Sequence, residues 1–202
     1  MPRIAAESIA EHVAHQEAAV LDAGVRLFLE RGYHQVTLGD IAAEVGLARN
    51  SLYRYVPDKA HILLLWYRRE VPRTITAWRA ATSGPGSPLD HLHRWAVSYL
   101  SWARTPEHAL LDPLLEARPA FDEAIRREIS ALHGEMMTVV HDAVAATGVP
   151  EADVAPVVEL LSGLVLAAAR AEATHPPEAV RPRLFAALDA LLTPPTLEEV
   201  AT

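Results

Sequence analysis

The sequence of 202 residues predicts an all-α fold of about nine helices. Apolar residues recur at helical spacing (i, i+3, i+4, i+7) through most of the chain, whereas the alternation typical of strands is rare. Prolines and glycines stand between the periodic segments, where they begin or end helices. Half of the residues are hydrophobic, which is the composition of a chain with a packed core rather than a disordered one.

The first predicted helix runs to about Arg31 and is ended by Gly32. Its inward face consists of apolar residues at helical spacing: Val20, Ala23, Leu27 and Phe28. The sequence does not decide whether residues 1–15 extend this helix.

Residues 37–59 predict two short helices joined by a turn at Gly46. Thr37 suits the N-cap of the first helix, and Asp40 can complete a capping box with it. The buried face of this helix consists of Leu38, Ile41, Ala42 and Val45. Gly46 can adopt the positive φ that ends one helix and redirects the chain into the next.

The second short helix combines an apolar side with an unusually polar one. Leu52 and Val56 face inward, and Leu47 fills the turn. The outward residues include no acid: Arg49, Asn50, Ser51, Tyr53, Arg54 and Tyr55. Guanidinium, amide, hydroxyl and phenol groups bind phosphates and base edges, so the pattern predicts a helix-turn-helix that contacts DNA. The alternative is a pair of packed helices with a solvated polar face.

Asp58 and Lys59 open the next predicted helix, which ends near Ser83 and is expected to be kinked at Pro72. Its N-terminal amides and Lys59 could hold a phosphate together. A linker follows at residues 83–88.

Prolines mark the starts of the following helices, since Pro88, Pro106 and Pro119 each suit a first helical turn. A long helix is expected over residues 119–146. Its apolar stripe consists of Phe121, Ile125, Ile129, Leu132 and Met136. Two exposed i, i+4 ion pairs are expected on it: Asp122 with Arg126 and Glu123 with Arg127.

Gly148 and Pro150 end that helix. The next helix is expected after Asp153, the last over residues 178–192, and a loose tail from Thr193 onward.

From Gln16 to Trp66 the chain resembles the DNA-binding domain of TetR-family transcriptional regulators. The matching segments are AAVLDAGVRLFLERGYHQVTL, DIAAEVGLARNSLYRYVPDK and HILLLWY. The chain departs from the family pattern at Gly24, Gly39 and Val56, and Gly39 has no side chain for a DNA contact.

The resemblance implies a DNA-binding domain over residues 1–66, ordered from about residue 16, and a ligand-binding and dimerisation domain over residues 67–202. The boundary then lies inside the helix that begins at Asp58. Base-edge contacts are expected from Arg49, Asn50 and Arg54. Phosphate contacts are expected from Thr37, Ser51, Tyr53, Tyr55 and Lys59. Such a regulator binds a palindromic DNA operator as a homodimer, and a small-molecule effector releases it; repression is the commoner outcome in the family.

The expected ligand-binding domain is rich in aromatic, methionine and histidine side chains, which suit an adaptable pocket for a largely apolar effector. The candidates are Trp78, Trp95, Tyr99, Trp102, Phe121, His133, Met136, Met137, His141 and Arg170. The alternative for each aromatic residue is an ordinary place in the core.

The helix after Asp153 is apolar on nearly all sides, so it must be covered on two sides. A homodimer formed with the last helix is expected from the resemblance. The candidate interface residues are Val157, Leu160, Gly163, Leu164, Ala167, Leu184, Leu188 and Leu191. The alternative is a central helix in a monomer. The apolar run over residues 154–169 is expected to be too short to span a bilayer.

The net charge is −8, but it is unevenly distributed along the chain. Residues 1–70 contain 8 basic and 9 acidic side chains, whereas residues 71–202 contain 10 and 17. A nearly neutral N-terminal part with a local basic surface agrees with salt-dependent DNA binding. The N-terminus has no secretory signal pattern, so a cytoplasmic protein is expected.

No cofactor and no metal are expected. The chain contains no cysteine, which excludes disulfides, thiolate catalysis and zinc sites with sulfur ligands. None of its ten histidines forms an HExxH motif, and no catalytic motif is present. A helical enzyme and a protein-binding module without DNA binding stay open as alternatives to the regulator.

Overall fold

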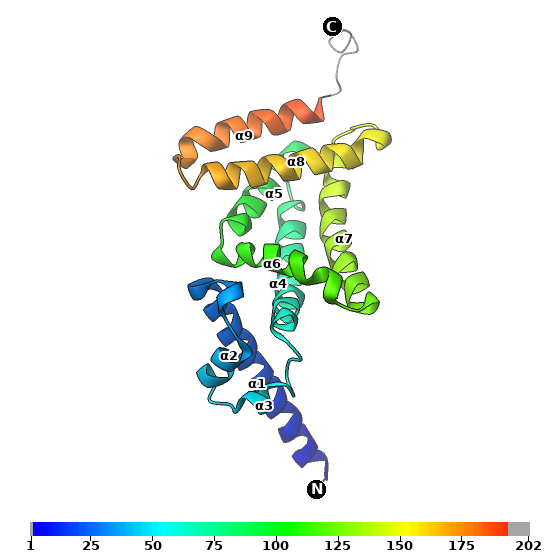
Figure 1. Cartoon of the computed structure of the whole chain (residues 1–202). Helices are drawn as coiled ribbons and strands as arrows, with labels where there is room; N and C mark the ends of the chain where they lie inside the picture. Colours follow the sequence, from blue (N-terminus) through cyan, green and yellow to red (C-terminus); the bar gives the residue numbers. More distant parts are fainter. Residues whose placement is uncertain (1, 194–202) are drawn as a thin grey trace. The chain divides into compact units, whose positions relative to one another are not determined.

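A computed structural model describes the backbone of residues 2–193 and the side chains of residues 11–193 (Figure 1). These residues form nine α-helices and three short 3-10 helices without a strand, which confirms the predicted all-α fold. The elements in chain order are α1 (Pro2–Arg31), η1 (Tyr33–Gln35), α2 (Leu38–Glu44), α3 (Arg49–Leu52), α4 (Lys59–Ala81), α5 (Pro88–Ala103), η2 (Pro106–Leu110), α6 (Leu111–Ala117), η3 (Arg118–Ala120), α7 (Glu123–Ala145), α8 (Glu151–Ala171) and α9 (Pro177–Leu192). The expected loose tail beyond Thr193 lies outside the described residues.

The chain divides into two compact units. Unit 1 contains the chain up to Glu70 together with Pro106–Arg127, and unit 2 contains Val71–Thr105 and the chain from Glu128 onward. One boundary between the units therefore lies inside α4 and another inside α7. The grouping of residues 106–127 with the N-terminal helices was not anticipated from the sequence. The functional division at residue 66 stays a prediction.

Unit 1 is built on α1, whose apolar residues Val20, Leu27 and Phe28 are buried as predicted. The helix begins at Pro2, so residues 2–15 extend it rather than forming a separate arm. Gly32 ends it with a φ of +84°, a conformation that favours glycine. α1 packs against α2, and α2 packs against α3.

The start of α7 differs from the expected helix over residues 119–146. Pro119 lies in the short helix η3, and Phe121 has an extended backbone with ψ of 152°. The side chain of Asp122 accepts a hydrogen bond from the Ile125 amide at 2.8 Å, so Asp122 caps α7. Arg126 Nη1 donates to the Phe121 carbonyl, and the expected Asp122–Arg126 pair stays a prediction.

In unit 2, α8 and α9 lie side by side as a helical hairpin, and α5 packs against α8 (Figure 1). The α5 helix begins with a capping box between Ser87 and Asp90, and Pro88 occupies its first turn as predicted. Asp90 Oδ2 accepts hydrogen bonds from the Ser87 amide and hydroxyl, each at 2.8 Å. These bonds lower the pKa of the Asp90 carboxyl, the backbone bond being the larger cause.

A buried carboxylate joins three segments of unit 2. The Glu172 side chain, at the C-cap of α8, has no exposed surface. Its oxygens accept hydrogen bonds from Arg104 Nη1 at 2.6 Å and from Arg181 Nε at 2.8 Å. The end of α5 and the first turns of α9 are thus both fastened to the end of α8.

The α8 helix begins at Glu151, two residues before Asp153, and continues to Ala171. By length and composition it could cross a membrane, with a mean hydropathy of 1.7 over an 18-residue window of which 33% is buried. The sequence prediction that this apolar segment is too short to span a bilayer is therefore wrong, because the helix continues beyond residues 154–169 on both sides. A core helix passes the same test, and α8 packs against α5 and α9.

Candidate nucleic-acid interface

The N-terminus of α2 is fixed by the predicted capping box. Thr37 Oγ1 accepts a hydrogen bond from the Asp40 amide at 3.2 Å, and Asp40 Oδ2 accepts one from the Thr37 amide at 2.8 Å. The Thr37 hydroxyl also donates to Asp40 Oδ2 at 2.6 Å. The bonds from Thr37, led by that of its side chain, lower the pKa of the Asp40 carboxyl.

The turn between α2 and α3 has the expected construction. Gly46 has a φ of +69°, and the Leu47 amide donates to the Ala42 carbonyl at 2.8 Å. Leu52 and Val56 are 0% and 1% exposed, so α3 is fixed from behind by apolar packing. This packing determines which side chains of α3 face away from the core.

The α3 helix is shorter than the two turns expected, because it covers only Arg49–Leu52. Residues 53–55 continue as a turn, in which the Arg54 amide donates to the Ser51 carbonyl at 3.2 Å. Pro57 prevents the helix from continuing beyond Val56, since a proline disfavours α conformation in the residue before it, but it does not account for the end at Leu52.

The outward face of α3 and its turn agrees with the sequence prediction in its exposure. Arg49, Asn50, Tyr53 and Arg54 are exposed, whereas Ser51 and Tyr55 are partly exposed. Arg54 Nη2 donates to Ser51 Oγ at 3.3 Å, which leaves the Ser51 hydroxyl proton available to another acceptor. The structure thus brings six of the eight predicted DNA-binding side chains onto one short segment.

The other two predicted DNA-binding residues, Thr37 and Lys59, are engaged inside the protein. The Thr37 hydroxyl has one proton, and that proton is donated to Asp40. The Lys59 ammonium donates to the carbonyls of Tyr33 at 2.8 Å and Val36 at 3.2 Å, and to that of His34 at 3.5 Å. The expected phosphate contacts of these two side chains are not supported, because their donors are used within unit 1.

The start of α4 also differs from the phosphate site expected there. Asp58 Oδ1 accepts a hydrogen bond from the His61 amide at 3.0 Å and lies 2.9 Å from His61 Nδ1. The Asp58 carboxylate thus accepts the hydrogen bond of the His61 amide, which a phosphate at the start of α4 would otherwise accept. The negative charge of Asp58 also repels a phosphate there.

Four of the predicted effector-binding residues form one aromatic cluster in unit 2. The Trp78 ring contacts three others, with centroid distances of 5.6 Å to Trp95, 4.9 Å to Tyr99 and 6.4 Å to Trp102. Trp78 and Trp95 are 1% and 0% exposed, and their indole N–H groups have no hydrogen-bond partner. Burial raises the pKa of Tyr99 to about 12. In this structure the rings pack on one another as core, which was the alternative reading.

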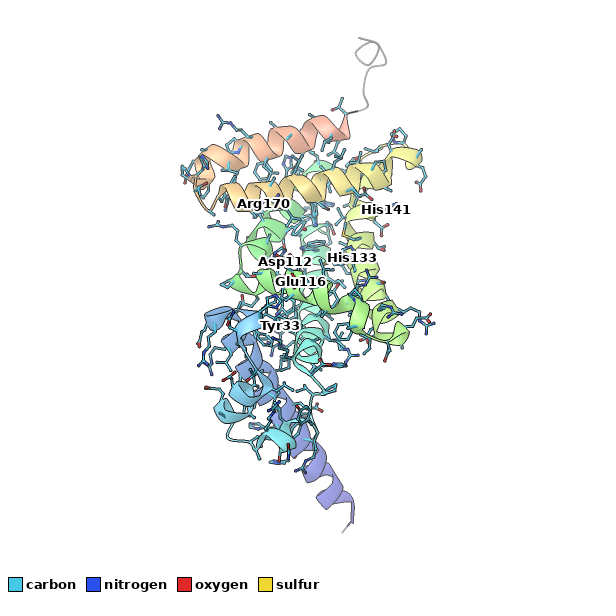
Figure 2. All side chains as sticks on the ribbon, viewed as in Figure 1. Tyr33, Asp112, Glu116, His133, His141 and Arg170 are labelled. Atoms are coloured by element: carbon cyan, nitrogen blue, oxygen red, sulfur yellow. The ribbon has the colours of Figure 1, made fainter. Side chains whose placement is uncertain are left out.

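The remaining effector candidates do not join this cluster. Phe121 belongs to unit 1, where its ring lies edge-on to His61 with centroids 5.3 Å apart. His133 and Arg170 are exposed, and His141 is partly exposed. Figure 2 labels the two histidines on α7 and the arginine on α8. Met136 is buried and Met137 is half-buried.

The predicted dimer residues divide into two groups. Val157, Leu184 and Leu188 are buried within one chain, because α8 and α9 pack their facing sides together. A dimer role for these three residues stays a prediction, and it is limited to the small surface that each leaves exposed in one chain. The others keep exposed surface at spacings of a helical stripe: Leu160, Gly163, Leu164 and Ala167 on α8, with Leu191 on α9.

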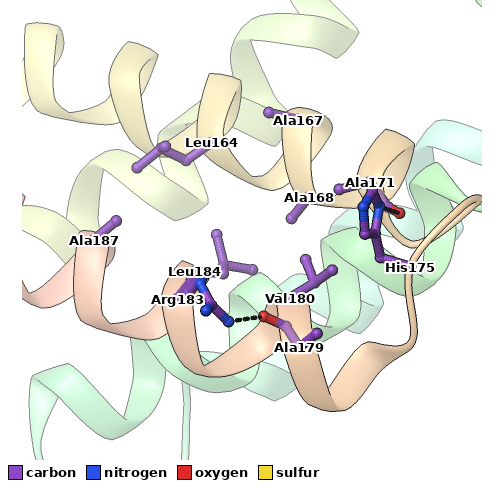
Figure 3. Close-up of a pocket in the computed structure, with 10 residues that line it drawn as sticks. All are labelled: Leu164, Ala167, Ala168, Ala171, His175, Ala179, Val180, Arg183, Leu184 and Ala187. Carbon is purple, nitrogen blue, oxygen red and sulfur yellow. Dashed lines mark hydrogen bonds between the residues drawn. The ribbon is translucent and has the colours of Figure 1, made fainter.

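An apolar groove of about 550 Å³ lies between α8 and α9 beside this stripe (Figure 3). Leu164, Ala167 and Leu184 line it, and Arg183 stands at its edge, where Nη1 donates to the Ala179 carbonyl at 2.6 Å. Within the described residues no group of three or more histidine and acidic side chains could hold a metal ion.

Comparison with known proteins shows what the chain is similar to. Residues 20–65 match the model of the bacterial regulatory proteins of the tetR family. The chain is 26% identical over 147 residues to the HTH-type transcriptional repressor KstR of Mycolicibacterium smegmatis. The aligned region covers 73% of this chain and 71% of that protein. Residues 20–65 thus match the TetR family's model, and the chain as a whole is similar to a TetR-type repressor.

Crystal structures of bacterial transcription regulators share most of the fold. A bacterial regulator from Rhodococcus RHA1 aligns with a TM-score of 0.72 at 15% identity and covers 89% of this chain and 98% of its own. A regulator from Saccharomonospora viridis, in complex with choline, aligns with a TM-score of 0.66 at 20% identity and covers 89% and 96%. The proteins that this chain resembles are transcription regulators rather than enzymes.

The structure explains one departure from the TetR pattern and accommodates two others. A Cβ atom at Gly24 would lie 2.7 Å from Ile62 Cγ2, so the glycine permits a close approach of α1 and α4. A Cβ at Gly39 would meet only Thr37 Oγ1, at 3.4 Å. Val56 fills its buried place with 1% of its surface exposed.

Two features of the TetR-like domain were missed in the sequence. One is the set of carbonyls around Lys59, and the other is the contact of residues 106–127 with the N-terminal helices. In the latter, His34 Nε2 lies 3.3 Å from Glu116 Oε2, and Phe121 lies against His61. Neither feature leaves a signal in helical periodicity, since the partners are more than 20 positions apart.

Proposed function

We propose that this TetR-family regulator is a repressor that binds a palindromic DNA operator as a homodimer and is released by a small, largely apolar effector. The observation that supports this most directly is the exposed face of α3. Arg49, Asn50 and Arg54 project from a segment whose other side is fixed by the fully buried Leu52. We assign these three side chains to base edges, and Ser51, Tyr53 and Tyr55 to phosphates.

The dimer is proposed to form through the exposed stripe of α8 together with the α8–α9 groove. Leu160 is 54% exposed, which is unusual for a leucine on a helix that is apolar on all sides. A Cβ atom at Gly163 would meet nothing within 4 Å, so a partner helix could approach closely there. A two-fold dimer places two recognition segments about 34–36 Å apart on successive turns of DNA.

Effector control is proposed to act through unit 2, with Trp78, Trp95, Tyr99 and Trp102 as the first candidates for the binding site. These rings are closely packed, so an effector would have to displace some of them. The relative that was crystallised with choline supports the idea that this fold binds small organic molecules. Release requires different effector affinities in two conformers, with a typical coupling of about 1–3 kcal/mol.

The proposed pivot is the part of α4 near Pro72. The boundary between the compact units falls between Glu70 and Val71, immediately before this proline. Proline removes one helical hydrogen bond and so weakens a helix at that point. A DNA-binding regulator acts where the chromosome is, which agrees with a cytoplasmic location.

The decisive experiment is the selection of bound sequences from random duplex DNA. A palindromic consensus is expected, with loss of enrichment for Arg54→Ala and unchanged enrichment for Arg127→Ala. Arg127 is a suitable control because it is an arginine on α7 whose side chain is 74% exposed. If no duplex is enriched at low salt, or if both variants behave alike, DNA recognition through α3 is refuted. A protein-binding module is then the better function.

A further inference from the structure

We infer that Lys59 is a positioning residue of the DNA-binding unit, whose ammonium fastens the start of α4 to the chain between α1 and α2. This inference rests on the proposed DNA-binding function only for its effect on operator affinity. Its effect on the stability of the free protein is independent of DNA.

The hydrogen bonds of Lys59 account for all the donors that it has. A lysine ammonium has three N–H groups, and Lys59 Nζ lies 2.8, 3.2 and 3.5 Å from the carbonyl oxygens of Tyr33, Val36 and His34. The nitrogen also lies 4.3 Å from the centroid of the Tyr33 ring, a distance typical of a cation–π contact. No donor is left that points to a phosphate.

These carbonyls need such a partner. Tyr33 and His34 belong to the single turn η1, and Val36 is its C-cap. Carbonyl oxygens at the end of a helix lack partners within it and accept hydrogen bonds from other groups. Val36 is only 2% exposed, and a buried carbonyl without a hydrogen bond costs free energy. The ammonium supplies the missing donors and a positive charge where carbonyl dipoles converge.

The position of Lys59 at the start of α4 strengthens this interpretation. It is the first residue of the helix, where the helix dipole disfavours a cation. The carbonyls and the Tyr33 ring offset that cost within the folded unit. The same contact sets the path of residues 33–36, directly before Thr37 caps α2. Displacement of this segment would therefore alter the placement of α2 and of the α3 segment that packs against it.

The first test compares Lys59→Met with Arg49→Met in the full-length protein without DNA. Both variants remove one positive charge and keep an apolar stem, but Arg49 is exposed on α3. The midpoint of thermal unfolding is expected to fall by roughly 4 °C or more for Lys59→Met and to change little for Arg49→Met. An unchanged midpoint for Lys59→Met would overturn the inference.

The second test measures the salt dependence of binding to the selected operator. Loss of a phosphate contact lowers the slope of log K against log salt by about 0.9 per contact. Lys59→Met is expected to weaken binding at all salt concentrations with the slope unchanged. A slope reduced as for a lost phosphate, with normal stability, would assign Lys59 to the DNA backbone instead. If the wild-type protein binds no duplex, the proposed function fails while the thermal test still decides the role of Lys59.

A third measurement applies if Lys59→Met does not fold. Lys59→Gln keeps two donors without the charge, and it is combined with Tyr33→Leu, which removes the ring beneath the ammonium. Because the two side chains are in contact, their effects on the unfolding midpoint are expected to be non-additive. The pair Arg49→Met and Tyr33→Leu, whose residues make no such contact, is expected to be additive. Additive effects in both pairs would overturn the inference.

Discussion

Replacement of Leu160 by alanine measures the proposed dimer surface directly. Leu160 is 54% exposed in the single chain, so about half of the burial free energy of a leucine, which is roughly 2 kcal/mol in full, is still to be gained in a dimer. Each copy would then contribute about 1 kcal/mol, and the two copies of a symmetric dimer about 2 kcal/mol. The dimer dissociation constant is expected to rise roughly 30-fold.

Sedimentation equilibrium over a range of protein concentrations measures this change, and the chain offers a close control. Leu115 on α6 is 58% exposed but belongs to unit 1 and is not part of the proposed interface. Leu115→Ala is expected to leave the dissociation constant unchanged. Equal effects of the two substitutions, or a dimer that tolerates Leu160→Ala, would refute the assignment of the α8 stripe.

Four further predictions concern stability and DNA recognition. Thr37→Ala removes the N-cap of α2 and should lower the free energy of unfolding in urea by about 1 kcal/mol. Hydrogen bonds from Thr37 lower the pKa of Asp40 in the folded state, so the ionised carboxyl stabilises the fold above the unfolded pKa of about 3.9. This stabilisation is lost as the pH falls through the folded pKa. In urea titrations the free energies of unfolding of the wild-type and Asp40→Asn proteins should therefore converge in acid, and a difference that stays constant with pH would contradict this. Glu172→Ala leaves Arg104 and Arg181 without their buried partner and should lower the free energy of unfolding in urea by about 2–3 kcal/mol. This is less than for a fully buried pair, because the two arginine side chains are 43% and 38% exposed. A loss below about 1 kcal/mol would show that the two guanidinium groups are hydrated by water instead. Arg54→Ala should weaken operator binding by about 1–3 kcal/mol and relax the sequence preference at one base pair of each half-site, and unchanged preference in a competition assay would remove Arg54 from the base contacts.

The sequence predicted the features of the helix-turn-helix that depend on near neighbours. The Thr37–Asp40 capping box, the positive φ of Gly46 and the burial of Leu52 each follow from residues within a few positions of one another. The α3 helix is shorter than its sequence predicts, since residues 53–55 form a turn instead of a second helical turn. Local chemistry thus predicted the type of site but not every boundary.

Features that depend on distant partners could not be predicted in this way. Lysine and threonine are reasonable phosphate ligands by residue type, but Lys59 meets carbonyls 23–26 positions earlier in the chain. The burial of Val157, Leu184 and Leu188 within one chain was likewise not predictable, because an apolar face does not reveal whether its own chain or a second copy covers it.

The discontinuous composition of unit 1 has a consequence for building chimaeric biosensors. A designer who grafts residues 1–66 onto a foreign sensory body would leave behind Phe121, which contacts His61, and Glu116, which pairs with His34. The grafted residues 1–66 would then expose to solvent the surface that residues 106–127 cover in unit 1. A functional graft must therefore import both stretches, or redesign the surface that the second one leaves bare.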